Sequence, residues 1–450
     1  MVKTGKILFV DPFSWSVTNY RWVNHEWLYD PFHYLFFNAF SFIGMSVAGA
    51  LLSVTWFYLG IKRYKISFVE KGILALYFSN MISGVVWQGL RIQMIGTLFI
   101  AILIYLIPNI QRADRKTLIF LPFMFMLCAN IHGYFILGLC IFALIILAQV
   151  VIEFKTMKKS TEGMLFISKQ ILLMSICFVV CFLATMVNPF TYHVYLEGLR
   201  HLHNPLLKYI LEWIPFDMFS SFSFIFFSYT IFIIGMFIKR RRITDLPYFF
   251  IFLFMGYYAL TARRYVSVYA VATLPMVALF LQDLNLRLDK YKVSAFIFLI
   301  CCVIGLEIGL FRRIPNNHLF TYTFNDYCNF GSGCSEEMVS YLKKNPPKGR
   351  GFNFYDWGGY LIGRGFPAKL FIDGRMHLWK DKNGYEPFSA YQKMYYDNDY
   401  ELFNKYNFDW LIIGKASPLF ERLSSTKELG MWDAVFESDN GVYLIRVKTK

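Results

Sequence analysis

Long apolar runs alternate with short polar stretches over the first two-thirds of the chain. Most of these runs are about 18 to 25 residues long, which is the length a helix needs to cross a hydrocarbon layer of about 30 Å. The runs lie near 32–59, 68–86, 92–108, 117–130, 133–152, 164–187, 221–238, 246–261, 265–282 and 293–311. Only the turn at His132 and Gly133 separates the fourth from the fifth, which form either two spans or a re-entrant pair. The pattern predicts a polytopic α-helical membrane domain of about ten spans over residues 31–311.

Beyond residue 312 the hydropathy falls and turn signals appear. The stretch SEEMVSYLKKNPP predicts a short helix with Ser335 as its N-cap, stopped by Pro346 and Pro347. The stretches GRGFNFY, AKLFIDGR, FDWLIIGK and GVYLIRVK predict strands, with a helix at 416–430 between the last two. Residues 312–450 are therefore expected to form a small α/β domain.

Composition and charge support a membrane protein. The chain is 56% hydrophobic, which is more apolar surface than a soluble core of this size buries, and its formal net charge is +15. Nucleic-acid binding is disfavoured because the positive charge sits in alternate short loops. The loops at 62–71, 112–116, 155–169, 239–242 and 287–292 each hold three or four Lys or Arg, whereas the intervening loops hold Arg91, Arg200, Lys208, Arg263 and Arg264.

This alternation is the positive-inside pattern of a multi-pass plasma-membrane protein. It places residues 1–30, a first loop expected to contain an interfacial helix, and the tail 312–450 outside the cytoplasm. An external N-terminus without an apolar segment before it has two explanations. Either a short basic segment crosses the membrane unaided, or the complete protein has a helix upstream.

The cysteines fall into two groups. Six of the eight lie in or beside apolar runs, where they are expected to act as small hydrophobic residues. Cys328 and Cys334 instead flank the Gly-rich run NFGSG in the predicted external tail, where oxidising conditions favour a local disulfide. A zinc site would need partners such as His318 at a suitable spacing, and the sequence offers none.

Polar residues collect on the predicted external side. The segment 11–30 carries Asp11, His25 and Glu26 among aromatic residues, and it forms either a belt helix on the membrane or part of a site. Arg91, Arg263 and Arg264 either reach lipid phosphate by snorkelling or bind a phosphate group. Asn130 and His132 either cap helix ends or contribute to a site.

The loop at 188–220 adds His193, His201, His203, Glu212 and Trp213, whose His-x-His pair could bind metal but lacks a neighbouring carboxylate. In the tail, Asp356 and Trp357 follow one predicted strand, while Asp373 and Arg375 follow the next, at positions that suit either turns or ligands. Because so many polar types share one side, the sequence favours a single site between the helix ends and the tail.

Several of these segments resemble, in order and spacing, a bacterial and archaeal branch of the GT-C superfamily of polytopic glycosyltransferases. They are DPFSWSVTNYRWVNHEWLYD, RIQM, NIHGYFILG, TMVNPF, the Glu212–Trp213 pair and YDWGGYLIGRGFPAKLFIDGR. The segments DWGGYLI and IDGR are also loosely similar to the WWDYG region of oligosaccharyltransferase catalytic subunits. This chain differs from the branch at two points. The branch normally has a helix before DPFS, and it more often has proline where this chain has Ile92.

The resemblance implies inverting transfer of a sugar from a polyprenyl-phosphate donor to a glycan, lipid or protein acceptor on the external face. Asp11 is the first choice for the catalytic base, because the family's acidic residue lies in this loop, and Glu26 is the second. Arg91, Arg263 and Arg264 would bind the donor phosphate. Some relatives also use a divalent cation, magnesium or manganese. The residues expected to contact substrate are His25, Gln93, Asn130, His132, Glu212, Asp356, Trp357, Asp373 and Arg375.

Two other functions remain open at this stage. A lipid or polysaccharide transporter or flippase would use the tail as a binding module, but transporters usually have interrupted helices and charges at the membrane midplane. A non-catalytic membrane scaffold would keep the fold without the activity. An enzyme requires Asp11 or Glu26 close to an external arginine, whereas scattered positions favour the scaffold.

Overall fold

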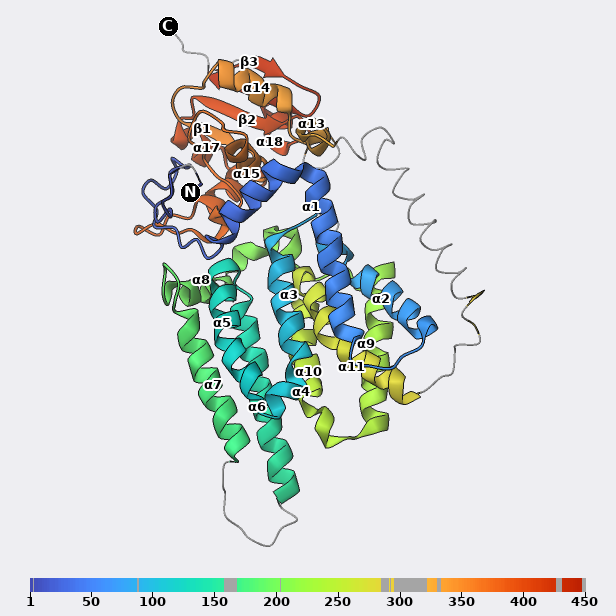
Figure 1. The fold of residues 1–450 in the computed structure, drawn as a ribbon. Helices are drawn as coiled ribbons and strands as arrows, with labels where there is room; N and C mark the ends of the chain where they lie inside the picture. Colours follow the sequence, from blue (N-terminus) through green and yellow to red (C-terminus); the bar gives the residue numbers. More distant parts are fainter. Residues whose placement is uncertain are drawn as a thin grey trace.

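A computed structural model describes residues 1–2, 4–86, 89–157, 168–202, 204–284, 291, 293–294, 322–329, 333–425 and 431–446. A bundle of helices carries a small mixed α/β unit at one end, beside the N-terminal segment (Figure 1). The predicted span near 293–311 falls outside the described residues from 295 onward, and so does His203.

The helices of the bundle follow the apolar runs closely. They are α1 (Tyr29–Ile61), α2 (Phe68–Val86), α3 (Ile92–Tyr105), α4 (Ile107–Gln111), α5 (Arg115–Ile131), α6 (Phe135–Met157), α7 (Lys169–Thr185), α9 (Ser221–Arg240), α10 (Leu246–Thr261) and α11 (Val266–Leu284). The apolar runs on either side of His132 form two helices, α5 and α6. Helix α11 lies at the centre, with almost every residue from Val266 to Phe280 buried.

Five helical segments of the described residues are long and apolar enough to cross a membrane. They are Tyr29–Ile61, Phe135–Thr156, Ser221–Arg240, Ile243–Thr261 and Arg263–Leu284, while α3 and α7 are shorter apolar helices. Many of their large apolar side chains are exposed, as expected of a surface that faces lipid. The structure supports a membrane protein with five candidate spans, and the predicted number of about ten is not confirmed.

Helix α1 bends at Ser41, whose backbone leaves the helical region with φ 55° and ψ −160°. The half before the bend runs beside the tail, and the half after it enters the bundle (Figure 1). Directly after the bend, the Phe42 ring contacts the rings of Tyr322, Phe324 and Tyr327, with centroids 5.1 to 6.2 Å apart. The bend therefore joins the bundle to α13 (Phe324–Tyr327) of the tail.

The tail contains a four-stranded sheet in the order β1-β2-β4-β3. Strand β1 (Gly351–Asn353) pairs parallel with β2 (Trp410–Gly414), which pairs antiparallel with β4 (Gly441–Arg446), and β3 (Trp432–Glu437) pairs antiparallel with β4. The helices are α14 (Glu336–Lys344), α15 (Tyr355–Gly363), η8 (Met376–Leu378), α16 (Pro387–Tyr395), α17 (Tyr400–Tyr406) and α18 (Pro418–Ser425). As predicted, Ser335 caps α14 by accepting a hydrogen bond from the Met338 N–H.

The predicted strand AKLFIDGR is wrong, because this segment makes only an isolated bridge at Leu370. Asn353 takes the place of a neighbouring strand. Its Oδ1 accepts hydrogen bonds from the N–H groups of Phe371 and Ile372, and its Nδ2 donates to the Ile372 carbonyl at 2.8 Å. A buried amide thus satisfies backbone groups that a sheet would otherwise pair.

The first loop packs into the tail. Residues 5–28 form turns and isolated bridges in place of the predicted interfacial helix. The Trp15 N–H donates to the Leu370 carbonyl, and its indole Nε1 donates to the Gly351 carbonyl, both at 3.0 Å. Val17 is buried in the same apolar core as Phe352 and Phe371. The loop and the tail therefore fold as one unit.

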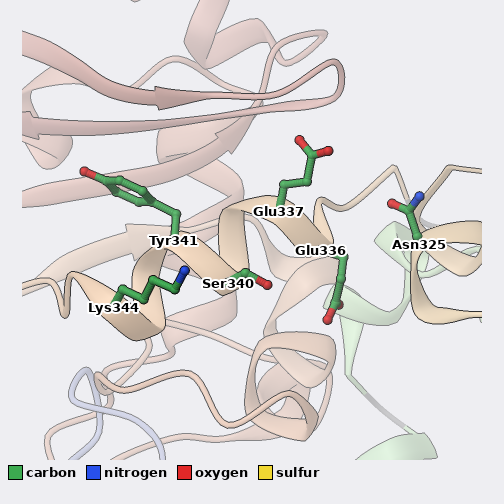
Figure 2. A pocket seen from close by; sticks show the side chains of 6 residues that line it. All are labelled: Asn325, Glu336, Glu337, Ser340, Tyr341 and Lys344. Carbon is green, nitrogen blue, oxygen red and sulfur yellow. The ribbon is translucent and has the colours of Figure 1, made fainter.

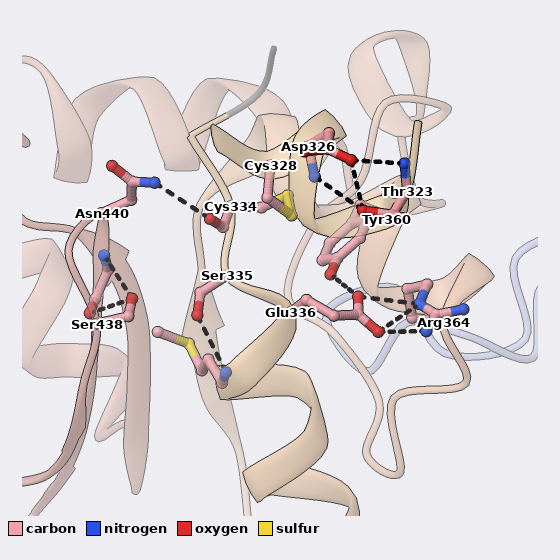
Figure 3. Close-up of a disulfide and its surroundings, with 12 residues drawn as sticks. Thr323, Asp326, Cys328, Cys334, Ser335, Glu336, Tyr360, Arg364, Ser438 and Asn440 are labelled. Atoms are coloured by element: carbon pink, nitrogen blue, oxygen red, sulfur yellow. Dashed lines mark hydrogen bonds and ion pairs between the residues drawn. A yellow bond between two sulfur atoms is a disulfide. The ribbon is translucent and has the colours of Figure 1, made fainter. Parts of the chain in front are cut away.

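Cys328 and Cys334 form a disulfide next to α14 (Figure 3). Both are buried in the core that contains Trp357 and Trp410. Below the bond, Glu336 accepts hydrogen bonds from Tyr360 and Arg364. These hydrogen bonds connect α14 to α15 and to the residue that follows it.

Candidate functional site: a polar cluster between bundle and tail

Two arginines and a carboxylate meet at the end of the bundle. Arg91 directly precedes α3, Glu212 lies in η2 (Leu211–Trp213), and Arg264 lies in η4 (Arg263–Tyr265) between α10 and α11. Glu212 Oε1 lies 3.3 Å from Arg264 Nη1, and Glu212 Oε2 lies 3.8 Å from Arg91 Nη2. The contact with Arg264 is a hydrogen bond, and both distances exceed those of tight charge-assisted bonds.

The two adjacent arginines of η4 point in different directions. The Arg264 guanidinium lies over the Trp213 ring at 4.2 Å, its side chain is 13% exposed, and its Nε is buried without a hydrogen-bond partner among the described residues. Arg263 instead donates from Nε to the Pro215 carbonyl at 3.2 Å. Only Arg264 of this pair belongs to the cluster with Glu212.

Glu26 lies in the field of these cations. Burial raises the pKa of its carboxyl to about 7, with a further increase from Asp30 and an opposing effect of Arg264 and Arg91. The Glu26 Oε1 atom lies 3.6 Å from His25 Nε2, and 34% of the Glu26 side chain is exposed. Burial also lowers the pKa of His25. Glu26 is therefore a carboxyl group that changes charge near neutral pH and remains accessible to a proton donor.

Asn130 lies beside this group but is fully engaged. Its Oδ1 accepts a hydrogen bond from Trp27 Nε1 at 2.9 Å, and its Nδ2 donates to the carbonyls of Met126 and Val187, both at 2.8 Å. The side chain therefore ties the first loop to the ends of α5 and α7. This geometry suits a structural role better than contact with substrate.

His132 is buried beneath the cluster, edge to face with Tyr134 at 4.3 Å. A Cβ atom on Gly96 would lie 2.4 Å from His132 Nδ1, so α3 approaches this ring as closely as only glycine allows. Burial lowers the pKa of His132 well below its usual value, and Arg264 lowers it further. Gln93, in the first turn of α3, has a buried Oε1 without a partner among the described residues.

The tail reaches the cluster through His377 in η8. Its ring lies 5.4 Å from that of His201 in α8 (His193–Leu202), at an interplanar angle of 71°. The His201 ring in turn stacks on the Trp213 ring at 5.5 Å, and the Arg264 guanidinium lies over that same Trp213 ring. Burial lowers the pKa of His377, and it lowers that of His201 to about 3. A continuous series of rings thus connects the end of the bundle to the tail.

Asp11 lies in a separate ionic group with Asp373 and Arg375. Its Oδ1 accepts from Arg375 Nη2 at 2.9 Å, and its Oδ2 accepts from the Ser14 hydroxyl at 2.6 Å and the Ser14 N–H at 2.8 Å. Arg375 also binds both oxygens of Asp373, at 2.8 and 2.7 Å. The Asp11 side chain is fully buried and that of Asp373 almost so. Because both Asp11 oxygens are engaged, this geometry favours a structural tie between first loop and tail.

The remaining predicted tail residues lie apart from the cluster. Asp356 is exposed in the first turn of α15, whereas Trp357 is buried in the tail core. A Cβ atom on Gly358 would lie 2.5 Å from the Ile372 carbonyl oxygen, so the DWGG motif here serves the close approach of α15 to the chain at Asp373.

A surface pocket lies over α14 and is not part of the cluster (Figure 2). It is lined by Asn325, Glu336, Glu337, Ser340, Tyr341 and Lys344. Its carboxylate Glu336 is already bound to Arg364 and Tyr360 (Figure 3). The chemistry expected from the sequence does not involve this pocket.

No group of three His, Cys, Asp or Glu side chains among the described residues is arranged to hold a metal ion. The cluster instead offers a carboxyl group that titrates near neutrality and two arginines held by a bridging carboxylate. These parts suit proton transfer next to an anion.

His377 is the residue that sequence reasoning missed. It follows Asp373 and Arg375 in the segment IDGRMH, and the ionic group of Asp11 fixes this turn. Its position directly after a predicted strand end was the available signal. The ring that it contacts belongs to His201, which the sequence analysis considered only as one member of a His-x-His pair.

No family model matches the chain, and no curated protein does either. Among solved structures, the chain is similar to the archaeal oligosaccharyltransferase AglB from Archaeoglobus fulgidus in complex with an inhibitory peptide and a dolichol-phosphate. The TM-score is 0.37 and the sequence identity is 13%. The match covers 83% of this chain and 52% of that one, so the chain spans about half the length of that protein.

Proposed function

We propose that this chain is a membrane glycosyltransferase that moves a sugar from a polyprenyl-phosphate donor to an acceptor hydroxyl, on the side of the membrane where the tail lies. One observation carries the proposal. Glu26, with a pKa raised to about 7, lies in the field of Arg91 and Arg264 at the end of a bundle of apolar helices. A lipid-linked phosphate arriving along the helices would meet cations and a proton acceptor together.

In the proposed reaction, the acceptor oxygen attacks the anomeric carbon while the bond from that carbon to the phosphate oxygen breaks. Glu26 accepts the acceptor's hydroxyl proton, and a general base of matched pKa accelerates such steps about 10²–10⁴-fold. Negative charge grows on the departing polyprenyl phosphate, and Arg91 and Arg264 stabilise it. Glu212 bridges the two arginines until the phosphate takes its place.

We assign the base to Glu26 in preference to Asp11. Arg375 binds one oxygen of Asp11 and Ser14 the other, and the Asp11 side chain is fully buried, so an acceptor hydroxyl cannot reach this carboxylate. Among the described residues, Glu26 has one partner within ion-pair distance, the His25 ring at 3.6 Å, and burial lowers the pKa of that ring, so it is neutral at pH 7. The base therefore comes from the first loop, as the resemblance implies, but from its second acidic residue.

The experiment is a transfer assay with a radiolabelled polyprenyl-phosphate hexose and membranes that contain the full chain. Wild type is expected to release the label from the lipid to an acceptor, and Arg264→Ala to transfer at least tenfold more slowly. Arg263→Ala is the matched control, because its guanidinium bonds to the Pro215 carbonyl outside the cluster. Equal rates in the two variants would contradict the phosphate site, and absence of transfer by wild type would favour a scaffold or a transporter.

A further inference from the structure

Three buried polar atoms near the cluster have no hydrogen-bond partner among the described residues. They are Arg264 Nε, Gln93 Oε1 and His377 Nε2. Arg264 and Gln93 belong to helix ends joined by Glu212, because Arg91, two residues before Gln93, pairs with that carboxylate. Native proteins rarely leave buried polar atoms unpaired, and a bound ligand, water or ion usually satisfies such atoms.

The tautomer of His377 is fixed by its own backbone. Its Nδ1 lies 3.0 Å from the Gly374 carbonyl oxygen, which only accepts hydrogen bonds, so Nδ1 carries the proton. Nε2 of the neutral ring is then a bare acceptor. Burial lowers the pKa of His377, and the nearby Arg264 lowers it further, so the ring is neutral at pH 7.

No described residue supplies the missing donor. The ring of His201 meets that of His377 edge to face, and His201 uses its own Nδ1 to bond the Glu197 carbonyl at 2.9 Å. The other charged or titratable groups whose fields reach His377 are Arg264, Glu212 and His25. The group that would satisfy Nε2 is therefore a neutral donor on the ligand, such as a hydroxyl.

We propose that His377 Nε2 accepts a hydrogen bond from a hydroxyl of the donor sugar, so that the tail itself recognises the sugar. The inference rests on the proposed function for the identity of the donor. A phosphate held by Arg264 places the sugar bonded to it next to that arginine, and the rings of Trp213 and His201 connect Arg264 to His377. The free Arg264 Nε–H suits a phosphate oxygen, and the free His377 Nε2 suits a sugar O–H. His377 thereby determines specificity, while Glu26 and the arginines carry the chemistry.

The test is binding of two ligands to the purified full chain in lipid nanodiscs. One is polyprenyl phosphate, and the other is polyprenyl-phosphate hexose, prepared with glucose, mannose and galactose. His377→Ala is expected to weaken binding of at least one hexose form about tenfold while affinity for the bare phosphate stays unchanged. His377→Gln should recover part of the loss, because its amide oxygen is also an acceptor near the position of Nε2.

His193→Ala is the matched control. The Nδ1 atom of His193 also bonds the carbonyl three residues earlier, that of Phe190, at 3.0 Å, but the ring stacks on Tyr192. The His193→Ala variant should bind the hexose forms and the bare polyprenyl phosphate with the same affinities as wild type. Unchanged affinity of His377→Ala for every hexose form would overturn the inference. An equal loss for hexose forms and bare phosphate would overturn it too, since this indicates a damaged site and not a lost hydroxyl contact. Failure of wild type to bind either lipid would instead contradict the proposed function.

Discussion

The charge of Glu26 opposes folding. Its pKa rises from 4.5 to about 7 on folding, so the folded protein binds more protons than the unfolded chain between these values. The destabilisation is absent below about pH 4.5, grows as the pH rises, and is complete above about pH 7. Glu26→Gln should therefore unfold at a higher temperature than wild type at pH 8, and at the same temperature near pH 4, by tryptophan fluorescence in detergent.

Glu421→Gln is the control for this measurement, because Glu421 is exposed in α18. It should shift the unfolding temperature at neither pH. If Glu26→Gln also unfolds at the wild-type temperature at pH 8, the Glu26 carboxylate is not destabilised by burial, and the basis for its choice as the base is lost.

Asp11 should affect stability more than chemistry. Asp11→Ala removes one partner of Arg375, and a hydrogen bond to a charged group is worth about 1.5–3 kcal/mol. The free energy of unfolding should fall by about 2 kcal/mol in thermal or denaturant unfolding, while the transfer rate per folded molecule stays close to wild type. Asp356→Ala, at an exposed carboxylate of the same unit, should change neither quantity. A stable but inactive Asp11→Ala protein would indicate that Asp11, and not Glu26, is the catalytic base.

Sequence reasoning predicted that polar residues from separate loops lie together, but not which of them pair with one another. Arg91, Glu212 and Arg264 come from three loops and meet as the alternating polarity predicts. The choice between Asp11 and Glu26 depends on Arg375, which lies far along the chain, and no local pattern reveals that pairing. The opposite directions of Arg263 and Arg264 likewise depend on the backbone near Pro215.

At the scale of elements, the bend of α1 holds the tail in place. Phe42→Ala removes three ring contacts with the segment 322–327, and aromatic pairs contribute about 0.5–1.5 kcal/mol each beyond their buried area. Hydrogen–deuterium exchange of residues 322–327 should become at least tenfold faster. Phe40→Ala, at a ring 58% exposed on the same helix, is the control and should leave exchange unchanged. Unchanged exchange in Phe42→Ala would show that other contacts hold the tail.

Elements with local signals were predictable, whereas those that depend on distant partners were not. Ser335 caps α14 because its side chain bonds the backbone three residues on, which the sequence shows directly. The segment AKLFIDGR has the composition of a strand, but Asn353 and the first loop satisfy its backbone instead. The strand propensity of this segment is therefore outweighed by its tertiary contacts with Asn353 and the first loop.

At the scale of the whole molecule, the disulfide provides a test of orientation. A disulfide between Cys328 and Cys334 suits the oxidising side of the membrane, and the described free cysteines are Cys128, Cys140, Cys177 and Cys181 in the bundle. In a variant whose other six cysteines are alanine, an impermeant maleimide should label intact cells only after an impermeant reductant. Labelling that requires cell lysis would place the tail in the cytoplasm and contradict the proposed orientation.

The most direct test of the central claim is the pH profile of sugar transfer by wild type and Glu26→Gln. The account predicts that kcat/KM of wild type for the polyprenyl-phosphate hexose rises with pH through an apparent pKa of about 7 and then levels off. Glu26→Gln should transfer about 10²–10⁴-fold more slowly and lose this inflection. A Glu26→Gln protein with the wild-type rate and the wild-type profile would contradict the account.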